Sequence, residues 1–431
     1  MQSTDPISTN GLLLEDAFLA PLIPLIEGTD MTRHCTSLDD LTFVTLNVLR
    51  CLQNCKTGRD FHQTHGIHTA PDLSRGNYFY NLSSTRRLAF TRQLADQMRI
   101  QHLSGLRAAD DSLAIFPELD KWEVYAADGH KMAHATHDCR NDKNEYSSVN
   151  GIYTMDLRTG YADFIAISKP TDRGTEHELT TLKRVPMERL RCGAGKGKST
   201  LFIYDRAIID FQYAYNIKQS KSIYILTRWK ENLSPLTTVA NEIDRSNHLN
   251  AMILSDETVT FNDGRGTWRK ITASCPDSDD IFIILTNQMT LPPGILNECF
   301  RLRWKIEKLF DQQEQKLDER KSWATSETAK STQALSICIT HNLLMLFKAT
   351  LKRDEEIEDT KVSHAYHADL DKREAKARKA GRIFPKALYV ALYRPTEISL
   401  QFIRWLRSSL MRSTFYRRAV ELLRPLMECY L

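Results

Sequence analysis

The order of secondary-structure signals between residues 122 and 217 constrains the fold of this chain more than any other feature. Three short runs rich in β-branched and aromatic residues come first, WEVYAAD, NGIYTMDL and YADFIAIS, with turn residues between them. A helical pattern over residues 174–191 follows, then the apolar run STLFIYD and a second helical pattern, AIIDFQYAYNI. This alternation is typical of a sheet with helices packed on its faces. The sequence therefore predicts an α/β core.

Regions of different composition flank and interrupt this core. Residues 1–115 read as mostly helical, and residues 217–287 consist of β-leaning runs separated by Asp, Asn and Gly. A long helix is predicted from Pro292-Pro-Gly294 to about Leu317. We therefore expect a helical, DNA-binding region at 1–115, an α/β core at 116–216 and 288–351, a β-rich insertion at 217–287 and a helical, basic region at 352–431.

The charge of the chain is unevenly distributed. The whole sequence carries only +4, but residues 361–431 contain 15 Lys and Arg against 6 Asp and Glu. A basic end on a slightly acidic body suits a polyanionic partner, and a solvated helix surface is the alternative. The same two alternatives hold for four arginines on a helix predicted after Ser84: Arg86, Arg87, Arg92 and Arg99.

Cysteine usage and hydropathy narrow the class of protein. The nine cysteines are scattered and include no CxxC pair, which favours reduced thiols over disulfides or a zinc knuckle. No stretch approaches the ~18 uninterrupted apolar residues of a membrane span. We therefore expect a cytoplasmic protein with no membrane partner.

Two aspartates each close a predicted strand of the core. Asp128 ends WEVYAAD and precedes Gly129, and Asp205 ends LFIYD. Open α/β sheets place their sites at the rim beyond the strand ends, and carboxylate oxygens are ligands for hard cations. Each Asp taken alone is more often a turn or cap residue. The pair together predicts a metal site.

The predicted helix ECFRLRWKIEKLFDQQEQKL mixes charged and aromatic residues on one side. Five residues spaced three and four apart share a helical stripe: Phe300, Arg303, Glu307, Phe310 and Glu314. One interpretation is an ion pair between Arg303 and Glu307 at the rim of the core, worth about 0.3 kcal/mol. The other is that Glu307 faces the metal site and Arg303 binds a DNA phosphate.

These motifs resemble a known family. Arg303-Trp-Lys-Ile-Glu307 is similar to the core of the YREK signature of bacterial insertion-sequence transposases of the insertion sequence four group. Ala127-Asp128-Gly129-His130 and Tyr204-Asp205-Arg206-Ala207 resemble the two Asp motifs of that group. The 101 residues between Asp205 and Glu307 are similar to its β-rich insertion. The resemblance implies a ribonuclease H-like core whose catalytic, metal-binding DDE triad is Asp128, Asp205 and Glu307.

Two positions depart from the signature, because Phe300 stands where the family has Tyr and Glu314 where it has Lys. The residues expected to contact DNA are Arg303, Phe300, Arg206, Arg228, Lys308, Lys316, Trp229 and Trp268. A tryptophan stacks readily on an unpaired base, and sheet packing is the alternative for both indoles.

The implied reaction attacks a DNA phosphodiester with water and then with a 3′-hydroxyl. Two Mg²⁺ (or Mn²⁺) ions about 3.5–4 Å apart activate the nucleophile and stabilise the leaving oxygen. Asp128 is expected to bind both ions, and Asp205 and Glu307 one each. The expected function is a Mg-dependent DDE transposase, acting as a homodimer on double-stranded inverted-repeat ends and target DNA at the bacterial nucleoid. The alternative is a DNA-binding protein derived from a transposase with a decayed site, which Phe300 and Glu314 motivate.

Two further motifs suggest other classes of protein. Residues 192–200, CGAGKGKST, resemble a phosphate-binding loop, but Cys192 stands where that loop requires Gly, and the run precedes a strand instead of a helix. His130 and His134 would share a face only on a helix, and the glutamate of HExxH is absent. A zinc hydrolase built on these histidines is a third hypothesis, which predicts stoichiometric zinc.

Overall fold

The computed structural model describes most of the chain, and its description rests on the following residues. These are residues 11–28, 38–53, 55, 57–66, 69–138, 149–171, 174–191, 195, 197–205, 209–262, 266–317, 319, 321–358, 360–392 and 398–428. Within them, the runs WEVYAAD, NGIYTMDL, YADFIAIS and STLFIYD form strands and the segments predicted as helical between residues 174 and 217 form helices, which confirms an α/β fold.

One continuous sheet holds nine of the described strands, in the order β3-β2-β1-β6-β7-β11-β10-β9-β8. β1 pairs with β6 and β6 with β7 in parallel, and the other neighbours are antiparallel. The strands are β1 Trp122–Met132, β2 Val149–Asp156, β3 Ala162–Ile167, β6 Ser199–Ile203, β7 Ile223–Arg228, β8 Thr237–Ala240, β9 Ile253–Thr260, β10 Trp268–Ser274 and β11 Ile281–Thr286. A separate hairpin joins β4 Pro170–Thr171 to β5 Gly174–Thr175. The strands of the predicted insertion therefore extend the central sheet and do not form a second one.

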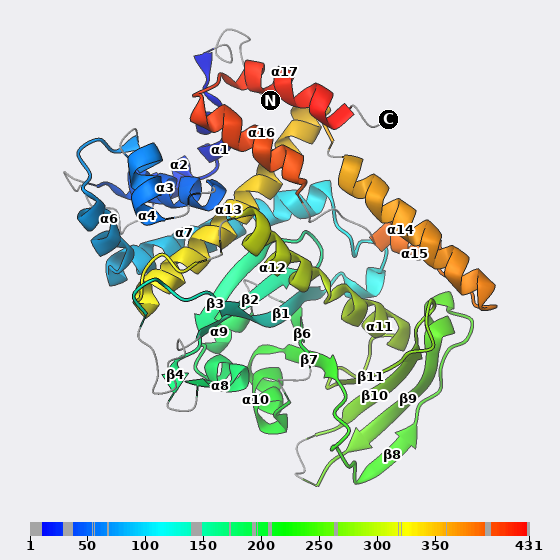
Figure 1. The fold of residues 1–431 in the computed structure, drawn as a ribbon. Helices are drawn as coiled ribbons and strands as arrows, with labels where there is room; N and C mark the ends of the chain where they lie inside the picture. The colour runs from blue at the N-terminus through cyan, green and yellow to red at the C-terminus, as the bar shows by residue number, and fades with distance from the viewer. Residues whose placement is uncertain are drawn as a thin grey trace.

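Helices cover both faces of this sheet (Figure 1). One face carries α7 Thr85–Ala109, α11 Pro293–Leu302, α12 Lys305–Lys316 and α13 Glu327–Glu355. The other carries α8 Glu178–Lys183, α9 Met187–Leu190 and α10 Phe211–Lys221. Short helices η3 Pro117–Leu119 and η4 His248–Met252 precede β1 and β9. The α/β core is thus a three-layer arrangement of helices, sheet and helices.

The two ends of the chain are helical. The N-terminal elements are α1 Leu14–Leu19, α2 Ile23–Glu27, α3 Asp40–Leu52, α4 Gly58–Phe61, η2 His62–Gly66 and α6 Arg75–Leu82. The C-terminal elements are α14 Thr360–Lys379, α15 Lys386–Leu392, α16 Leu400–Met411 and α17 Tyr416–Glu428. Figure 1 shows α14 reaching toward the β10–β11 end of the sheet, where Arg373 Nε lies 2.6 Å from Asp277 Oδ2.

Helix α13 is the one described helix long and apolar enough to cross a membrane by length and composition. In the fold, however, 72% of its most apolar window is buried. The apolar side chains of α13 pack against α7, α3 and β3. Its composition is therefore accounted for by its position at the centre of the helical layer.

The arginines of α7 occupy neither of the two positions predicted for them. Arg87 is 1% exposed and pairs with buried Asp40. Arg92 and Arg99 both pair with Asp163 on β3. The sequence predicted DNA contacts or a solvated face, but α7 packs between the sheet, α3 and α13, and ion pairs compensate the charges that this packing buries.

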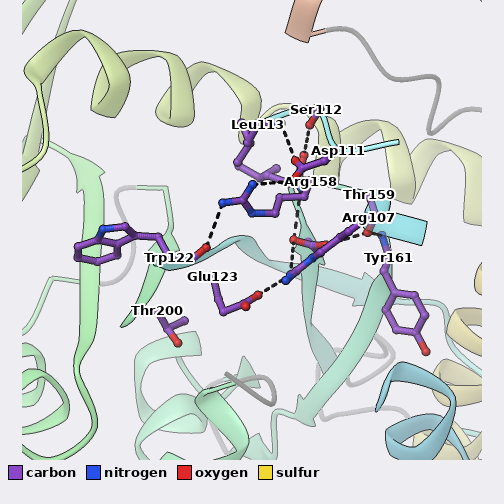
Figure 2. Close-up of polar contacts among 12 residues, drawn as sticks. Arg107, Asp111, Ser112, Leu113, Trp122, Glu123, Arg158, Thr159, Tyr161 and Thr200 are labelled. Carbon is purple, nitrogen blue, oxygen red and sulfur yellow. Dashed lines mark hydrogen bonds and ion pairs between the residues drawn. The ribbon is translucent and has the colours of Figure 1, made fainter. Parts of the chain in front are cut away.

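A second ion-pair network fixes the start of β1 (Figure 2). Arg107, at the end of α7, pairs with Glu123 of β1 and lies 3.2 Å from Asp156 of β2. Arg158 lies 2.7 Å from Asp111 and donates to the carbonyl oxygen of Trp122 at 3.3 Å. Because removing one partner would leave a buried charge uncompensated, the network holds the first residues of β1 in place.

The predicted helix 292–317 is broken into two. α11 ends at Leu302, and α12 begins at Lys305. Across the junction, the N–H of Arg303 donates to Phe300 O at 3.2 Å and that of Glu307 to Trp304 O at 3.2 Å. These bonds to the third preceding residue tighten one turn into 3₁₀ geometry. The prediction of a single helix was therefore wrong. Both half-helices have helical periodicity in the sequence, so this periodicity does not reveal the break between them.

Gly294 fixes where α11 starts, and we expect Gly294→Ala to lower the free energy of unfolding by about 3 kcal/mol. A Cβ at this position would lie 2.2 Å from the backbone oxygen of Leu249 in η4, which cannot move aside as a side chain can. The measurement is urea unfolding followed by circular dichroism. Gly105→Ala in α7 is the matched control, because a Cβ there meets nothing within 4 Å and should stabilise the helix by about 0.5–1 kcal/mol. Equal effects of the two variants would contradict this account.

Candidate active site

Asp128 and Asp205 stand at matching positions on neighbouring parallel strands. The pairing between β1 and β6 ends at Ala126 and Ile203, and Asp128 and Asp205 each follow two residues later. The sequence placed Asp128 at the end of its strand, which was wrong, because β1 continues to Met132 by pairing with β2 alone. Asp128 nevertheless borders an open edge, since β6 has ended beside it.

The strand pleat turns Asp128 toward α12. Val124 and Ala126 of β1, and Leu201 and Ile203 of β6, face the core that contains α12, whereas the residues between them face α8 and α10. Side chains two apart on a strand share a face, so Asp128 follows the first set, whereas Asp205 lies two residues beyond the end of β6. One strand and one helix thus supply acids to the same side of the sheet, and Asp205 follows the neighbouring strand.

Arg303 connects the acid of β1 with the acid of α12. Its Nη1 lies 3.2 Å from Asp128 Oδ2, and its Nη2 lies 2.9 Å from Glu307 Oε1. The Arg303 side chain is 11% exposed, that of Asp128 22% and that of Glu307 33%. The i,i+4 ion pair of the first interpretation therefore forms, and the same guanidinium brings Glu307 near Asp128.

The electrostatic environment of Asp128 is unfavourable for a carboxylate. The pKa of Asp128 is raised to about 6, mainly because the group is buried and also because of the charges of Glu178 and Glu307. Arg303 and the N–H of Gly129, which donates to Asp128 Oδ1 at 2.9 Å, act in the opposite direction. A group with several acidic neighbours is one that an additional cation would stabilise in its ionised form.

Glu178 is an acid of this site that sequence analysis did not find. It is the first residue of α8, on the opposite face of the sheet, and its carboxylate lies against the backbone of Gly129. Burial and the charge of Asp205 raise the pKa of Glu178. The sequence carried only an indirect signal, a glycine directly after Asp128, because nothing local connects residues 129 and 178.

The donor set has the chemistry of a divalent-cation site. Asp128, Glu178, Asp205 and Glu307 offer hard carboxylate oxygens, which Mg²⁺ and Mn²⁺ prefer. Among the described residues, no three Asp, Glu, His or Cys side chains already converge into a ready-made metal cluster. Arg303 instead supplies the positive charge between two of the acids. The residues fit divalent cations by chemistry, and Arg303 competes with a cation for Asp128 and Glu307.

The predicted DNA-contact residues are not all accessible. Phe300 is 9% exposed and belongs to the core, and Trp268 is 3% exposed and packs against Phe211, 5.0 Å between ring centroids. Lys316 Nζ donates to the carbonyl oxygen of Ile398 at 2.7 Å. In this conformation these three residues therefore have structural roles, and for Trp268 the packing alternative is the one observed.

The other predicted contacts lie nearer to solvent. Lys308 is exposed on α12, and Arg228 and Trp229 are half-buried where β7 ends. Arg206 lies outside the described residues. Trp304, at the α11–α12 junction directly after Arg303, is 58% exposed. No local pattern distinguishes Trp304, because a tryptophan between two arginine- and lysine-rich turns cannot be assigned to surface or core until the helix break is known.

The described residues do not provide the geometry that the zinc hypothesis or the phosphate-loop hypothesis requires. His130 lies in strand β1, and His134 follows the strand in a non-helical segment, so the two do not share a helix face. Cys192 and its two following residues lie outside the described part of the chain. His130 instead stacks on Phe310 of α12, with ring centroids 4.5 Å apart.

Glu314, the acid in place of the signature lysine, belongs to a small cluster beside the site. His130 Nε2 lies 3.5 Å from Glu314 Oε1 and 3.6 Å from Glu319 Oε2. Tyr153 donates to Glu319 Oε1 at 3.4 Å, and Glu319 is 4% exposed. Burial raises the pKa of Glu319 to about 8, and the charge of Glu314 adds to this shift. Glu319 is therefore neutral in the fold at pH 7.

This buried acid predicts a pH dependence of stability. Because the pKa of Glu319 is about 8 in the fold and near 4.5 in the unfolded chain, its contribution is fully present below pH 4.5 and is lost as the pH rises through 8. The full loss is on the order of 4 kcal/mol. We expect Glu319→Gln to gain stability relative to wild type between pH 5 and 8.5, measured by urea unfolding. Glu118→Gln, at an exposed position, is the control, and parallel profiles for all three proteins would refute the prediction.

A family model described as "Transposase DDE domain" matches residues 120–343, which is more than half of the 431 residues. The match begins just before β1 and ends within α13, so it contains Asp128, Glu178, Asp205 and Glu307. A search of curated proteins finds no match.

Proposed function

The chain belongs to the transposase DDE domain family, and we propose that it is a DNA transposase whose triad is Asp128, Asp205 and Glu307. It cuts the ends of an insertion sequence by phosphodiester hydrolysis and joins them to target DNA by strand transfer. The observation that carries the proposal is the Arg303 bridge between Asp128 and Glu307, beside the matching position of Asp205 on the next strand. We further propose membership of the insertion sequence four group and a ribonuclease H-like core.

The chain's own residues prepare the reacting site. Asp128, Asp205 and Glu307 would hold two Mg²⁺ or Mn²⁺ ions, which when bound activate the attacking oxygen and stabilise the leaving oxygen. Arg303 holds Asp128 and Glu307 in place before DNA arrives. A DNA phosphate beside α12 offers the guanidinium a second anionic partner, so DNA would draw Arg303 away from the acids. Arg303 thereby couples DNA binding to exposure of the carboxylates.

Several surfaces are proposed to bind DNA. Lys308 and Trp304 are exposed next to the triad, and Arg228, Trp229 and Arg206 are proposed along the adjoining strand ends. An exposed indole can stack on a base, and exposed Lys and Arg side chains attract phosphates. The same proposal includes the domain boundaries given above. It also includes a homodimer on DNA that pairs two ends through the basic C-terminal helices, and a cytoplasmic, nucleoid-associated location.

The test uses the purified full-length protein and a duplex that carries the inverted repeats flanking its coding segment. Mg²⁺-dependent strand cleavage at the repeat end, abolished by EDTA and absent on a scrambled duplex, is the expected result. Binding of the repeat without cleavage in Mg²⁺ or Mn²⁺ would favour a DNA-binding protein with a decayed site. Neither binding nor cleavage would overturn the proposal.

A further inference from the structure

Glu178 approaches the triad from the opposite face of the sheet. Asp128 faces α12, whereas the next residue, Gly129, faces α8, because successive strand residues alternate between faces. A Cβ on Gly129 would lie 2.0 Å from Glu178 Oε1 and 2.5 Å from its Cδ. The carboxylate of Glu178 therefore occupies the space that the missing side chain leaves open. No other residue type at position 129 would allow this approach without moving Glu178.

In this position Glu178 interacts electrostatically with both aspartates. Its charge acts on Asp128, and the charge of Asp205 acts on it. Among the described residues, the Glu178 carboxylate has no hydrogen-bond or ion-pair partner, whereas Asp128 and Glu307 share Arg303. A half-buried carboxylate beside two others, without a cationic partner, is unfavourable unless a cation joins them.

We infer that Glu178 is a fourth acidic ligand of the divalent-cation site, bound to the ion held between Asp128 and Asp205. The inference rests on the proposed function and deepens it. β6 ends at Ile203, so the gap between the ends of β1 and β6 is open to a ligand from either face of the sheet. α12 supplies Glu307 from one face, and α8 supplies Glu178 from the other. The site is thus formed by four acids on four separate elements.

A purely structural role makes a different prediction. If Glu178 served the fold, its removal would destabilise the protein. The carboxylate lies beside Asp128 and Asp205, however, so neutralising it removes like-charge repulsion. Glu178→Gln is therefore expected to unfold at the same temperature as wild type or at a higher one, while its cation affinity falls.

The experiment is calorimetric titration of Mn²⁺ into the full-length protein without DNA. Glu178→Gln is expected to weaken Mn²⁺ binding about 10-fold or more, and Glu178→Asp, which keeps the charge on a shorter stem, should lose less. Glu188→Gln is the matched control, an exposed acid of α9 that pairs with Lys221 and should bind Mn²⁺ as wild type does. Gly129→Ala should weaken binding alone but add nothing in the Glu178→Gln background, because both changes act through one carboxylate.

Asp205→Asn separates failure of this inference from failure of the proposed function. If Asp205→Asn weakens Mn²⁺ binding and Glu178→Gln does not, the fourth ligand is overturned and the triad stands. If Glu178→Gln lowers the unfolding temperature and Glu178→Asp restores neither stability nor affinity, Glu178 supports the fold and the inference is again overturned. If the wild-type protein binds no Mn²⁺ and cleaves no repeat-end duplex, the proposed function fails together with this inference.

Discussion

Asp128→Asn, Asp205→Asn and Glu307→Gln are each expected to lower Mg²⁺-dependent cleavage of a repeat-end duplex by at least about 10³-fold. A residue that only orients a metal ligand typically accounts for 10- to 100-fold, and removal of a ligand itself should exceed that. The amides keep the size of the side chains but remove the charge that attracts a divalent cation. The measurement is the single-turnover rate of strand cleavage with excess protein.

DNA binding by the same variants should survive or become tighter, because each substitution removes a negative charge that faces the phosphate backbone. The unfolding temperature of Asp128→Asn should not fall, since the pKa of Asp128 is already raised to about 6, mainly by burial. Asp120→Asn is the control, an exposed acid next to the opposite end of β1 from Asp128. Wild-type cleavage rates in the Asp128 and Glu307 variants would exclude the transposase proposal.

Arg303→Gln is expected to change cation affinity and cleavage in opposite directions. Without DNA, the variant should bind Mn²⁺ about 5-fold more tightly, because the ion pairs that compete for Asp128 and Glu307 are gone and such partly exposed pairs are worth roughly 1 kcal/mol. Cleavage of the repeat-end duplex should nevertheless fall by about 10²-fold, since a phosphate loses its two-pronged partner.

Arg303→Lys is the informative companion variant. Lysine keeps the charge but cannot bridge two carboxylates with a planar fork, so its Mn²⁺ affinity and cleavage rate should lie between those of Arg303→Gln and wild type. Weaker Mn²⁺ binding in Arg303→Gln would show that the guanidinium supports the cation site instead of competing with it, and the proposed coupling between DNA and cation binding would have to be abandoned.

Much of the sheet and of the candidate triad was accessible from local sequence patterns. The runs WEVYAAD and STLFIYD predicted β1 and β6, because alternation and β-branched content act over a few residues. The position of Asp128 and Asp205 after two apolar runs predicted that both would lie at the rim of the sheet. The exact end of β1 was missed, because pairing with β2 prolongs it beyond its apolar part.

Burial decides the role of other residues, which local sequence leaves open. Arg87 on α7 and Lys316 on α12 have sequence contexts that fit a DNA-binding surface equally well. The fold places Arg87 against Asp40, and it uses Lys316 to bind the carbonyl oxygen of Ile398. Both partners are far away in the sequence, so no local pattern distinguishes a phosphate contact from an internal one.

The sequence by itself determined the α/β order, the two strand-borne aspartates and the helical spacing of Arg303 and Glu307. These depend on backbone periodicity and neighbouring side chains, which are local properties. Only the tertiary structure decided that Arg303 spans Asp128 and Glu307, that Trp304 is exposed at a helix break and that Glu178 reaches the same site over Gly129. The physical reason is that charge compensation and solvent exposure depend on residues brought together across the sheet, over separations that local sequence does not encode.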